Sequence, residues 1–224
     1  MQRTIRIAFA LIFLSLVTLA ILPGRSIAQR NDRRIQDCED PDARLLSALD
    51  ECIQQRFKDI DFTFGYRRII RAGDTPHRFK PENAKEVQAV GELAKSNLKV
   101  VFYLAGRSVL GAKPSEPELT AGKLIKGPAL ITLASEMYAN LPKASELWDE
   151  SRKAMLAFEK TNQYDFTVGK WKFAARAVRA SEQSCLDCHV SGAASLFPVN
   201  SQDAQKRTLR LGDPLGVALY AYER

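Results

Sequence analysis

The chain has 224 residues, of which 46% are hydrophobic and 26% charged, and it carries a formal net charge of +7. This balance excludes a low-complexity or intrinsically disordered chain and is typical of a soluble globular protein. The length is sufficient for one substantial domain with an N-terminal extension.

Residues 1–28 have the pattern of a secretory signal. Arg3 and Arg6 precede an uncharged apolar run, Ile7 to Leu22, and Ser26-Ile27-Ala28 offers the small residues that a signal peptidase reads. The apolar run is shorter than the roughly 20 residues of a membrane-spanning helix, so cleavage is expected and an uncleaved anchor is the alternative. Cleavage would leave a soluble protein outside the cytoplasm, in the periplasm or an equivalent space. The mild positive charge that remains predicts no nucleic-acid partner.

Residues 29–60 are predicted to form a charged leader and an N-terminal helix. Apolar side chains recur at helical spacing between residues 41 and 57, which indicates an amphipathic helix there. Cys38 lies before this helix and Cys52 within it. In an oxidising compartment a disulfide between them is the default expectation. Its geometry requires the segment that contains Cys38 to fold back along the helix.

Residues 61–224 are predicted to form one α+β domain. In chain order, the patterns predict an extended segment at 62–66, a helix from about 83 to 97, a strand over 98–104, a helix from Pro128 to Leu141, a helix over 144–158, and strands over 171–179 and 215–222. Pro128 stands where a helix would begin, and Pro142 would end it. The turn Gly212-Asp213-Pro214 leads into the last strand.

The most specific motif is Cys185-Leu186-Asp187-Cys188-His189, which has the form C-x-x-C-H and occurs once. Two thiols at this spacing can each add across a vinyl group of one haem, and the histidine that follows can bind the iron. These five residues resemble the haem site of c-type cytochromes. The resemblance implies one covalent haem c, with Cys185 and Cys188 as its thioether ligands and His189 as the proximal axial ligand. It also implies attachment outside the cytoplasmic membrane, in agreement with the signal.

Two other uses of the cysteine pair are open. A zinc site would need two further Cys or His ligands at matching spacing, which the sequence does not offer beside the motif. A redox-active dithiol would be expected early in a βαβ unit, whereas this pair lies close to the C-terminus. Haem attachment is therefore the favoured interpretation, and a dithiol oxidoreductase is an alternative.

Strands are predicted on both sides of the motif, which small all-helical cytochromes do not normally have. The segments WKFAARAVRASEQSCLDCH and LRLGDPLGVALY resemble the PAS-like haem domains of periplasmic sensors. There a strand leads into the cysteine pair and a glycine-acidic turn leads into the closing strand. The resemblance implies an antiparallel sheet with flanking helices. A mostly α c-type cytochrome is the alternative fold.

The second axial ligand of the iron is left open by the sequence. Once the signal is removed, two methionines and one histidine besides His189 remain as candidates: Met137, Met155 and His77. A methionine raises the reduction potential, a second histidine lowers it, and a vacant or otherwise filled position is equally compatible with the sequence. Each methionine lies on the apolar face of a predicted helix, where filling the core is the usual role.

Other side chains are candidates for the surroundings of the haem. Arg176 and Arg179 precede the motif and could pair with the two propionates, since guanidinium matches a carboxylate well. Aromatic residues could line the porphyrin or simply form the core; these are Trp171, Phe173, Phe197 and Tyr220.

The sequence favours an electron carrier without enzymatic activity. With two histidines outside the signal, one of them in the haem motif, a Ser-His-Asp or Cys-His arrangement would depend on His77. The expected function is single-electron exchange with a redox partner protein. The alternative is a haem-based redox or gas sensor that acts through a partner, since no signalling segment follows Tyr222.

Overall fold

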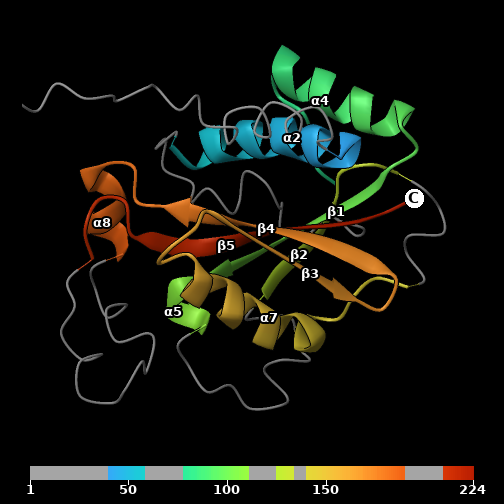
Figure 1. Cartoon of the computed structure of the whole chain (residues 1–224). Helices are drawn as coiled ribbons and strands as arrows, with labels where there is room; N and C mark the ends of the chain where they lie inside the picture. The colour runs from blue at the N-terminus through green and yellow to red at the C-terminus, as the bar shows by residue number, and fades with distance from the viewer. Residues whose placement is uncertain (1–39, 59–77, 111–124, 134–139, 190–208) are drawn as a thin grey trace, which may run out of the picture. The chain divides into compact units, whose positions relative to one another are not determined.

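Five antiparallel strands form one sheet in the order β2-β1-β5-β4-β3 (Figure 1). The strands are β1 (Lys99–Gly106), β2 (Ile125–Leu130), β3 (Gln163–Val168), β4 (Trp171–Arg179) and β5 (Pro214–Glu223). β5 is the last strand in the chain but lies at the centre of the sheet, where it pairs with β1 on one side and with β4 on the other. The α+β class and the antiparallel sheet expected from the sequence are confirmed, and the mostly α alternative is wrong.

The computed structural model describes residues 40–58, 78–110, 125–133, 140–189 and 209–224. These residues all belong to one compact unit, 40–224. Several sequence-based expectations lie outside the described residues and stay predictions. They are the signal at 1–28, the leader up to residue 39, the extended segment at 62–66, and the roles considered for Cys38, His77, Met137 and Phe197.

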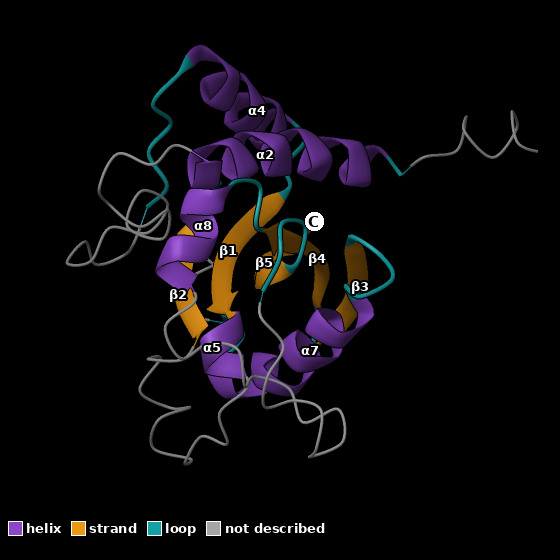
Figure 2. Cartoon of the chain, turned by 90° about the vertical axis from the view of Figure 1, so that its left-hand side faces the viewer, coloured by secondary structure: helices purple, strands orange, loops and turns teal. Residues whose placement is uncertain are grey.

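Helices cover both faces of the sheet (Figures 1 and 2). On one face, α2 (Pro41–Lys58) and α4 (Ala84–Lys95) pack against β1, β4 and β5, chiefly through the buried cluster Leu46, Leu49, Ile53, Leu93, Val100, Phe102, Ala174, Ala218 and Tyr220. On the other face, α7 (Ala144–Ala157) and the short α5 (Arg107–Leu110) pack against the cluster Val101, Tyr103, Leu147, Met155, Phe158, Trp171, Phe173 and Leu219. Strand side chains alternate between the two clusters, as the pleat requires.

The helices begin and end where local chemistry favours it. In α4 the side chain of Asn83 accepts a hydrogen bond from the Glu86 N–H at 3.0 Å, which satisfies one of the unpaired donors at the helix N-terminus. In α2 the apolar side chains at helical spacing are the ones that face the sheet. The helices predicted over 41–57, 83–97 and 144–158 are confirmed within one to two residues.

The helix predicted to begin at Pro128 is wrong in its first residues, which the structure describes as part of a strand. Pro128 lies inside strand β2, whereas the sequence predicted a helix from Pro128 to Leu141. The apolar spacing after Pro128 resembles a helical stripe, but Ala129 and Leu130 pack against opposite faces of the sheet. Proline lacks a donor N–H and is tolerated because β2 is an edge strand.

β3, the other edge strand, was not predicted from the sequence. Tyr164, Phe166 and Val168 are half-buried against the cluster under α7, while the residues between them are exposed. This alternation is a strand signal of period two. A turn at Gly169, which has φ +59°, joins β3 to β4.

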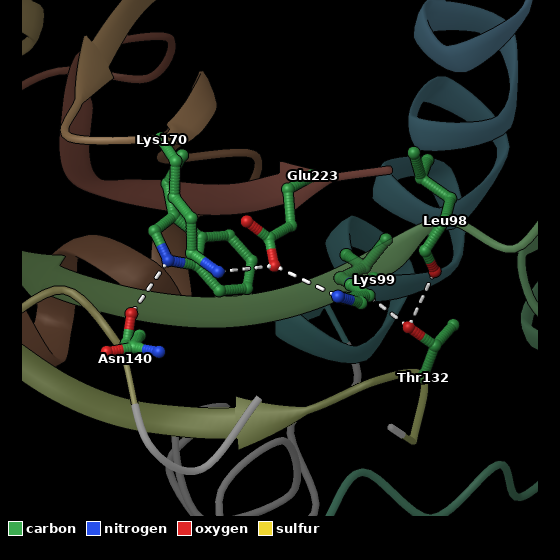
Figure 3. A network of polar contacts seen from close by, with 8 residues as sticks. Leu98, Lys99, Thr132, Asn140, Lys170 and Glu223 are labelled. Atoms are coloured by element: carbon green, nitrogen blue, oxygen red, sulfur yellow. Dashed lines mark hydrogen bonds and ion pairs between the residues drawn. The ribbon is translucent and has the colours of Figure 1, made fainter. Parts of the chain in front are cut away.

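A polar network fastens the end of the sheet where β5 finishes (Figure 3). The carboxylate of Glu223 accepts hydrogen bonds from Lys99 at 3.2 Å and Lys170 at 3.0 Å, which links β1 and the β3–β4 turn to β5. The Thr132 hydroxyl accepts from the Val100 N–H and donates to the Leu98 carbonyl, which continues the pairing of β2 beside β1. The opposite end of the sheet, where β5 begins, is the end at which the cysteine motif lies.

A partly buried hydrogen bond joins helix α2 to strand β5 of the sheet. The hydroxyl of Tyr220, which is fully buried on β5, donates to the Asp50 carboxylate at 2.7 Å. Gln54 donates to the same carboxylate at 3.1 Å and to the Ala177 carbonyl of β4 at 3.3 Å. The charged or titratable groups around Asp50 are Tyr220, Arg176 and Glu51.

We expect Asp50→Asn to raise the free energy of unfolding at neutral pH. Burial raises the pKa of Asp50, and the hydrogen bonds from Tyr220 and Gln54 only partly oppose this shift. The folded protein therefore holds the proton more tightly than the unfolded chain does. Wild-type stability should fall as pH rises from the ordinary aspartate pKa through the raised folded pKa.

Urea unfolding of both proteins between about pH 3.5 and 7.5 measures this difference. Asparagine keeps an oxygen that accepts the Tyr220 hydrogen bond, so the packing is matched. The stability advantage of Asp50→Asn should grow across this pH range and then level. An advantage that shrinks as pH rises would contradict the assignment.

Candidate functional site

The cysteine motif lies on a short helix at the start of β5. Helix α8 (Gln183–His189) follows β4 after three residues and is the last helix before β5 among the described residues. An α-helix turns about 100° per residue, so positions 185, 188 and 189 fall within an arc of about 100° on one side. The helix therefore carries two cysteine positions and one histidine position next to one another. The motif is visible in the sequence, but the helix that carries it was not predicted.

Cys185 links the motif to the sheet. Its side chain is half-buried and carries a free thiol. It packs against a small apolar cluster of Ala180, Leu186, Leu209 and Leu215, which joins α8 to β5 and to the residues before it. The Ser181 hydroxyl lies 3.8 Å from the Cys185 sulfur. The apolar contacts hold one end of the motif in a fixed position.

His189 ends the helix and is half-buried. Burial lowers the pKa of its imidazole, since removing water disfavours the charged form. A neutral imidazole has a lone pair on one ring nitrogen and can bind a metal ion. Helix α8 thus offers the donor type that a haem iron requires.

The turn before β5 is hydrogen-bonded to Ala180, which follows β4 and precedes α8. The Gly212 N–H donates to the Ala180 carbonyl at 2.8 Å, and the Ala180 N–H donates to the Asp213 carbonyl at 3.0 Å. The Asp213 carboxylate accepts from the Arg210 N–H at 2.9 Å, which closes the turn. Gly212 has φ +87°, a conformation that favours glycine. The turn that the sequence predicted at 212–214 is confirmed, as are the strands on both sides of the motif.

Arg179 has a structural role at this turn. Its guanidinium donates to Asn162 and to the carbonyls of Gly212, Phe158 and Thr161, at 2.6–3.0 Å. Four of the five N–H donors of an arginine are therefore engaged. Arg176 donates to Asp165 at 3.1 Å and to the Ala175 carbonyl at 3.0 Å. The structure employs both arginines within the sheet, which does not support the expectation that they pair with haem propionates.

The aromatic residues singled out from the sequence divide between the two faces of the sheet. Trp171 and Phe173 belong to the cluster under α7, whereas Tyr220 belongs to the cluster under α2. Residues on opposite faces of one sheet cannot line the same porphyrin. The interpretation of this set as core residues is therefore supported for these three.

The candidates for the second axial position are only partly described. Met155 is 2% exposed and packs in the core between α7 and the sheet.

Cys52 lies on α2 as a free, half-buried thiol, and burial raises its pKa, with a further contribution from Glu86. A disulfide between Cys38 and Cys52 stays a prediction.

The residues of α8 fit a covalently held haem. Attachment of a haem requires two reduced thiols one helical turn apart and an imidazole beside them, and α8 supplies these three positions in one rigid element. Among the residues that the structure describes, no group of three or more Cys, His, Asp or Glu side chains is arranged to hold a metal ion by itself. Once bound, a haem would supply a one-electron redox centre.

Comparison with known protein families, curated proteins and solved structures finds no match to this chain. Within the described ranges, none of the helices combines the length and the apolar character needed to cross a membrane.

Proposed function

We propose that this protein is an exported c-type cytochrome that carries one covalent haem and transfers single electrons to a redox partner protein. The observation that carries the proposal is the placement of Cys185, Cys188 and His189 on one short helix that is fixed to the sheet. The export signal expected at residues 1–28 places the protein in a compartment where haem can be attached.

Each residue of the motif has a defined role in this proposal. Each thiol of Cys185 and Cys188 adds across one vinyl group: a carbon–sulfur bond forms, and the thiol hydrogen is transferred to the other vinyl carbon. No oxidant is consumed, but both thiols must be reduced. The imidazole of His189 then serves as the proximal ligand of the iron. Because the three residues occupy neighbouring positions on one helix, all of them can reach the same haem.

We further propose that the domain is PAS-like. Its support is the five-stranded antiparallel sheet, together with the strand β4 that leads into the cysteine pair and the glycine-acidic turn that leads into β5. A PAS-like fold favours the second candidate function, a redox or gas sensor that reports through a partner.

The decisive experiment is expression of the full chain together with a cytochrome c maturation system. We expect one haem per chain that survives denaturing electrophoresis and acid-acetone extraction. The variant Cys185→Ser/Cys188→Ser is the control and should carry no covalent haem. A wild-type protein without covalent haem, whose two motif thiols titrate freely or as a disulfide, would overturn the proposal and favour a dithiol oxidoreductase.

The spectrum of the reduced protein separates the two haem functions. A six-coordinate iron that does not respond to CO or NO favours electron transfer. A change of the Soret band on addition of either gas favours sensing, because it requires an open or displaceable axial position.

A further inference from the structure

The two cysteines of the motif can react with each other as well as with a haem. Positions 185 and 188 are three residues apart on α8, so their Cα atoms lie about 5 Å apart, within the range that a disulfide spans. In an oxidising compartment a C-x-x-C pair forms such a bond. Haem attachment needs both thiols reduced. A contact that disfavours the disulfide would therefore favour haem uptake.

Ser181 makes a contact of this kind with Cys185. Its hydroxyl oxygen lies 3.8 Å from the Cys185 sulfur, within the reach of a weak hydrogen bond to sulfur. Ser181 stands two residues before α8 begins, so the sulfur that contacts it is directed toward the N-terminal end of the helix. Position 188 lies the other way, about 4.5 Å further along the helix axis. The Cys185 sulfur would have to leave Ser181 to come within about 2 Å of a sulfur at position 188.

Both partners of this contact are anchored to the turn before β5. Ala180, which precedes Ser181, donates its N–H to the Asp213 carbonyl at 3.0 Å and accepts from the Gly212 N–H at 2.8 Å. The Cys185 side chain packs against the apolar cluster that includes Ala180. The hydroxyl and the sulfur are therefore held beside each other by the surrounding fold.

We infer that Ser181 positions Cys185 for haem attachment, and that the hydrogen bond between its hydroxyl and the Cys185 sulfur disfavours a disulfide between Cys185 and Cys188. The inference rests on the proposed function and adds a positioning residue to that site. Ser184 offers a natural comparison, since it lies on α8 directly before Cys185. Within the part of the chain that the structure describes, its buried hydroxyl oxygen has no hydrogen-bond partner.

The test is a thiol–disulfide equilibrium of the full chain without haem, in mixtures of reduced and oxidised glutathione. The two motif thiols are oxidised to one disulfide while glutathione disulfide is reduced to two thiols, so electrons and protons balance. After the remaining thiols are alkylated, mass spectrometry of the tryptic peptide 180–206 gives the oxidised fraction. This peptide contains only the two cysteines of the motif. The variants are Ser181→Ala, Ser181→Thr and Ser184→Ala.

We expect Ser181→Ala to raise the equilibrium constant for the disulfide about two- to tenfold, the effect of losing one hydrogen bond. Ser181 is exposed, so this change leaves the core intact. The same variant should carry less covalent haem when it is expressed with the maturation system. Ser181→Thr keeps the hydroxyl and should match the wild type. Ser184→Ala removes a hydroxyl that bonds to no described group and should also match it.

A wild-type equilibrium constant in Ser181→Ala would overturn the inference. It would equally be overturned if Ser181→Thr behaved like Ser181→Ala, because the hydroxyl would then not be responsible. A shift of the same size in Ser184→Ala would also contradict it, since any polar loss beside the motif would have that effect. The glutathione equilibrium is measured without haem, so these outcomes are separate from the proposed function. A wild-type protein that takes up no covalent haem would instead remove that function, on which the inference rests.

Discussion

Replacing His189 with alanine is expected to leave the haem covalently attached while abolishing the wild-type Soret position and reduction potential. The two thioether bonds depend on Cys185 and Cys188, which this change leaves in place. His189 occupies a neighbouring position on α8, and burial lowers the pKa of its imidazole, which favours the neutral form. Its removal takes away the nitrogen ligand that sets the spin state and potential of the iron.

Replacing either cysteine should produce a different defect. Cys185→Ala or Cys188→Ala leaves at most one thioether bond, so a part of the haem should be released by acid-acetone. Asp187→Ala is the matched control on the same helix, because this exposed side chain bonds only to Gln183 among the contacts the structure describes for it. It should behave as wild type in both assays.

Optical spectra, potentiometric titration and haem extraction of these four proteins distinguish the roles. A His189→Ala protein with an unchanged Soret band and potential would mean that a residue outside the motif is the proximal ligand. Full haem retention in both cysteine variants would mean that the thiols are not the points of attachment.

The central elements of the fold could be predicted from the sequence because their local signals agree with their final environment. β4 and β5 are rich in apolar and aromatic residues and are buried on both faces, so their strand signal is strong. Helix α2 shows one apolar stripe that packs on one face of the sheet. For these elements, burial reinforces the preference that the residues already have.

The edge strands could not be predicted so readily because packing overrides their local signals. β2 contains Pro128, which usually argues against a strand and favours the start of a helix. Its place at the edge of the sheet makes the missing N–H harmless, but the edge position depends on the pairing of distant segments. β3 alternates clearly, yet it is short and half-exposed, so its signal is weak.

The candidate site shows the same division. The C-x-x-C-H spacing is a property of five consecutive residues and needs no knowledge of the fold. The surroundings of the motif depend on the tertiary fold. Arg176 and Arg179 were expected from the sequence to pair with the haem propionates because they precede the motif. Their guanidinium groups bind residues of neighbouring strands and turns, through contacts that exist only in the folded sheet. Sequence proximity alone does not predict which groups these arginines bind, because a β-sheet places distant residues side by side.

We expect the ion pair between α2 and α4 to affect the free energy of unfolding more than any other polar contact among the described residues. Arg56 is 6% exposed and Glu86 is 1% exposed. The Arg56 Nε donates to a Glu86 oxygen at 2.6 Å, its Nη2 donates to the other oxygen, and Nη2 also donates to the Lys80 carbonyl at 2.7 Å. The Phe79 ring lies 4.4 Å from the guanidinium carbon. Loss of Glu86 would remove the carboxylate that faces the buried Arg56 charge.

We expect Glu86→Ala to lower the free energy of unfolding by about 3–5 kcal/mol, the usual cost of breaking a buried pair. The double variant Arg56→Met/Glu86→Leu should recover most of this loss, because it buries no charge. Lys153→Met is the control: Lys153 pairs with Glu150 on an exposed face of α7, where removing the pair should have little effect. Urea unfolding of the four proteins measures these differences.

The pH dependence supplies an independent check of this pair. Burial alone would raise the pKa of Glu86, but hydrogen bonds from Arg56 and from the Glu82 N–H outweigh it and the net pKa is lowered. The folded protein therefore releases this proton more readily than the unfolded chain, so the stabilisation is present above the ordinary glutamate pKa and is lost as pH falls through the lowered one. The stability gap between wild type and Glu86→Ala should close on acidification. A gap that stays constant, or a double variant as unstable as the single one, would show that the loss comes from packing and not from the charge.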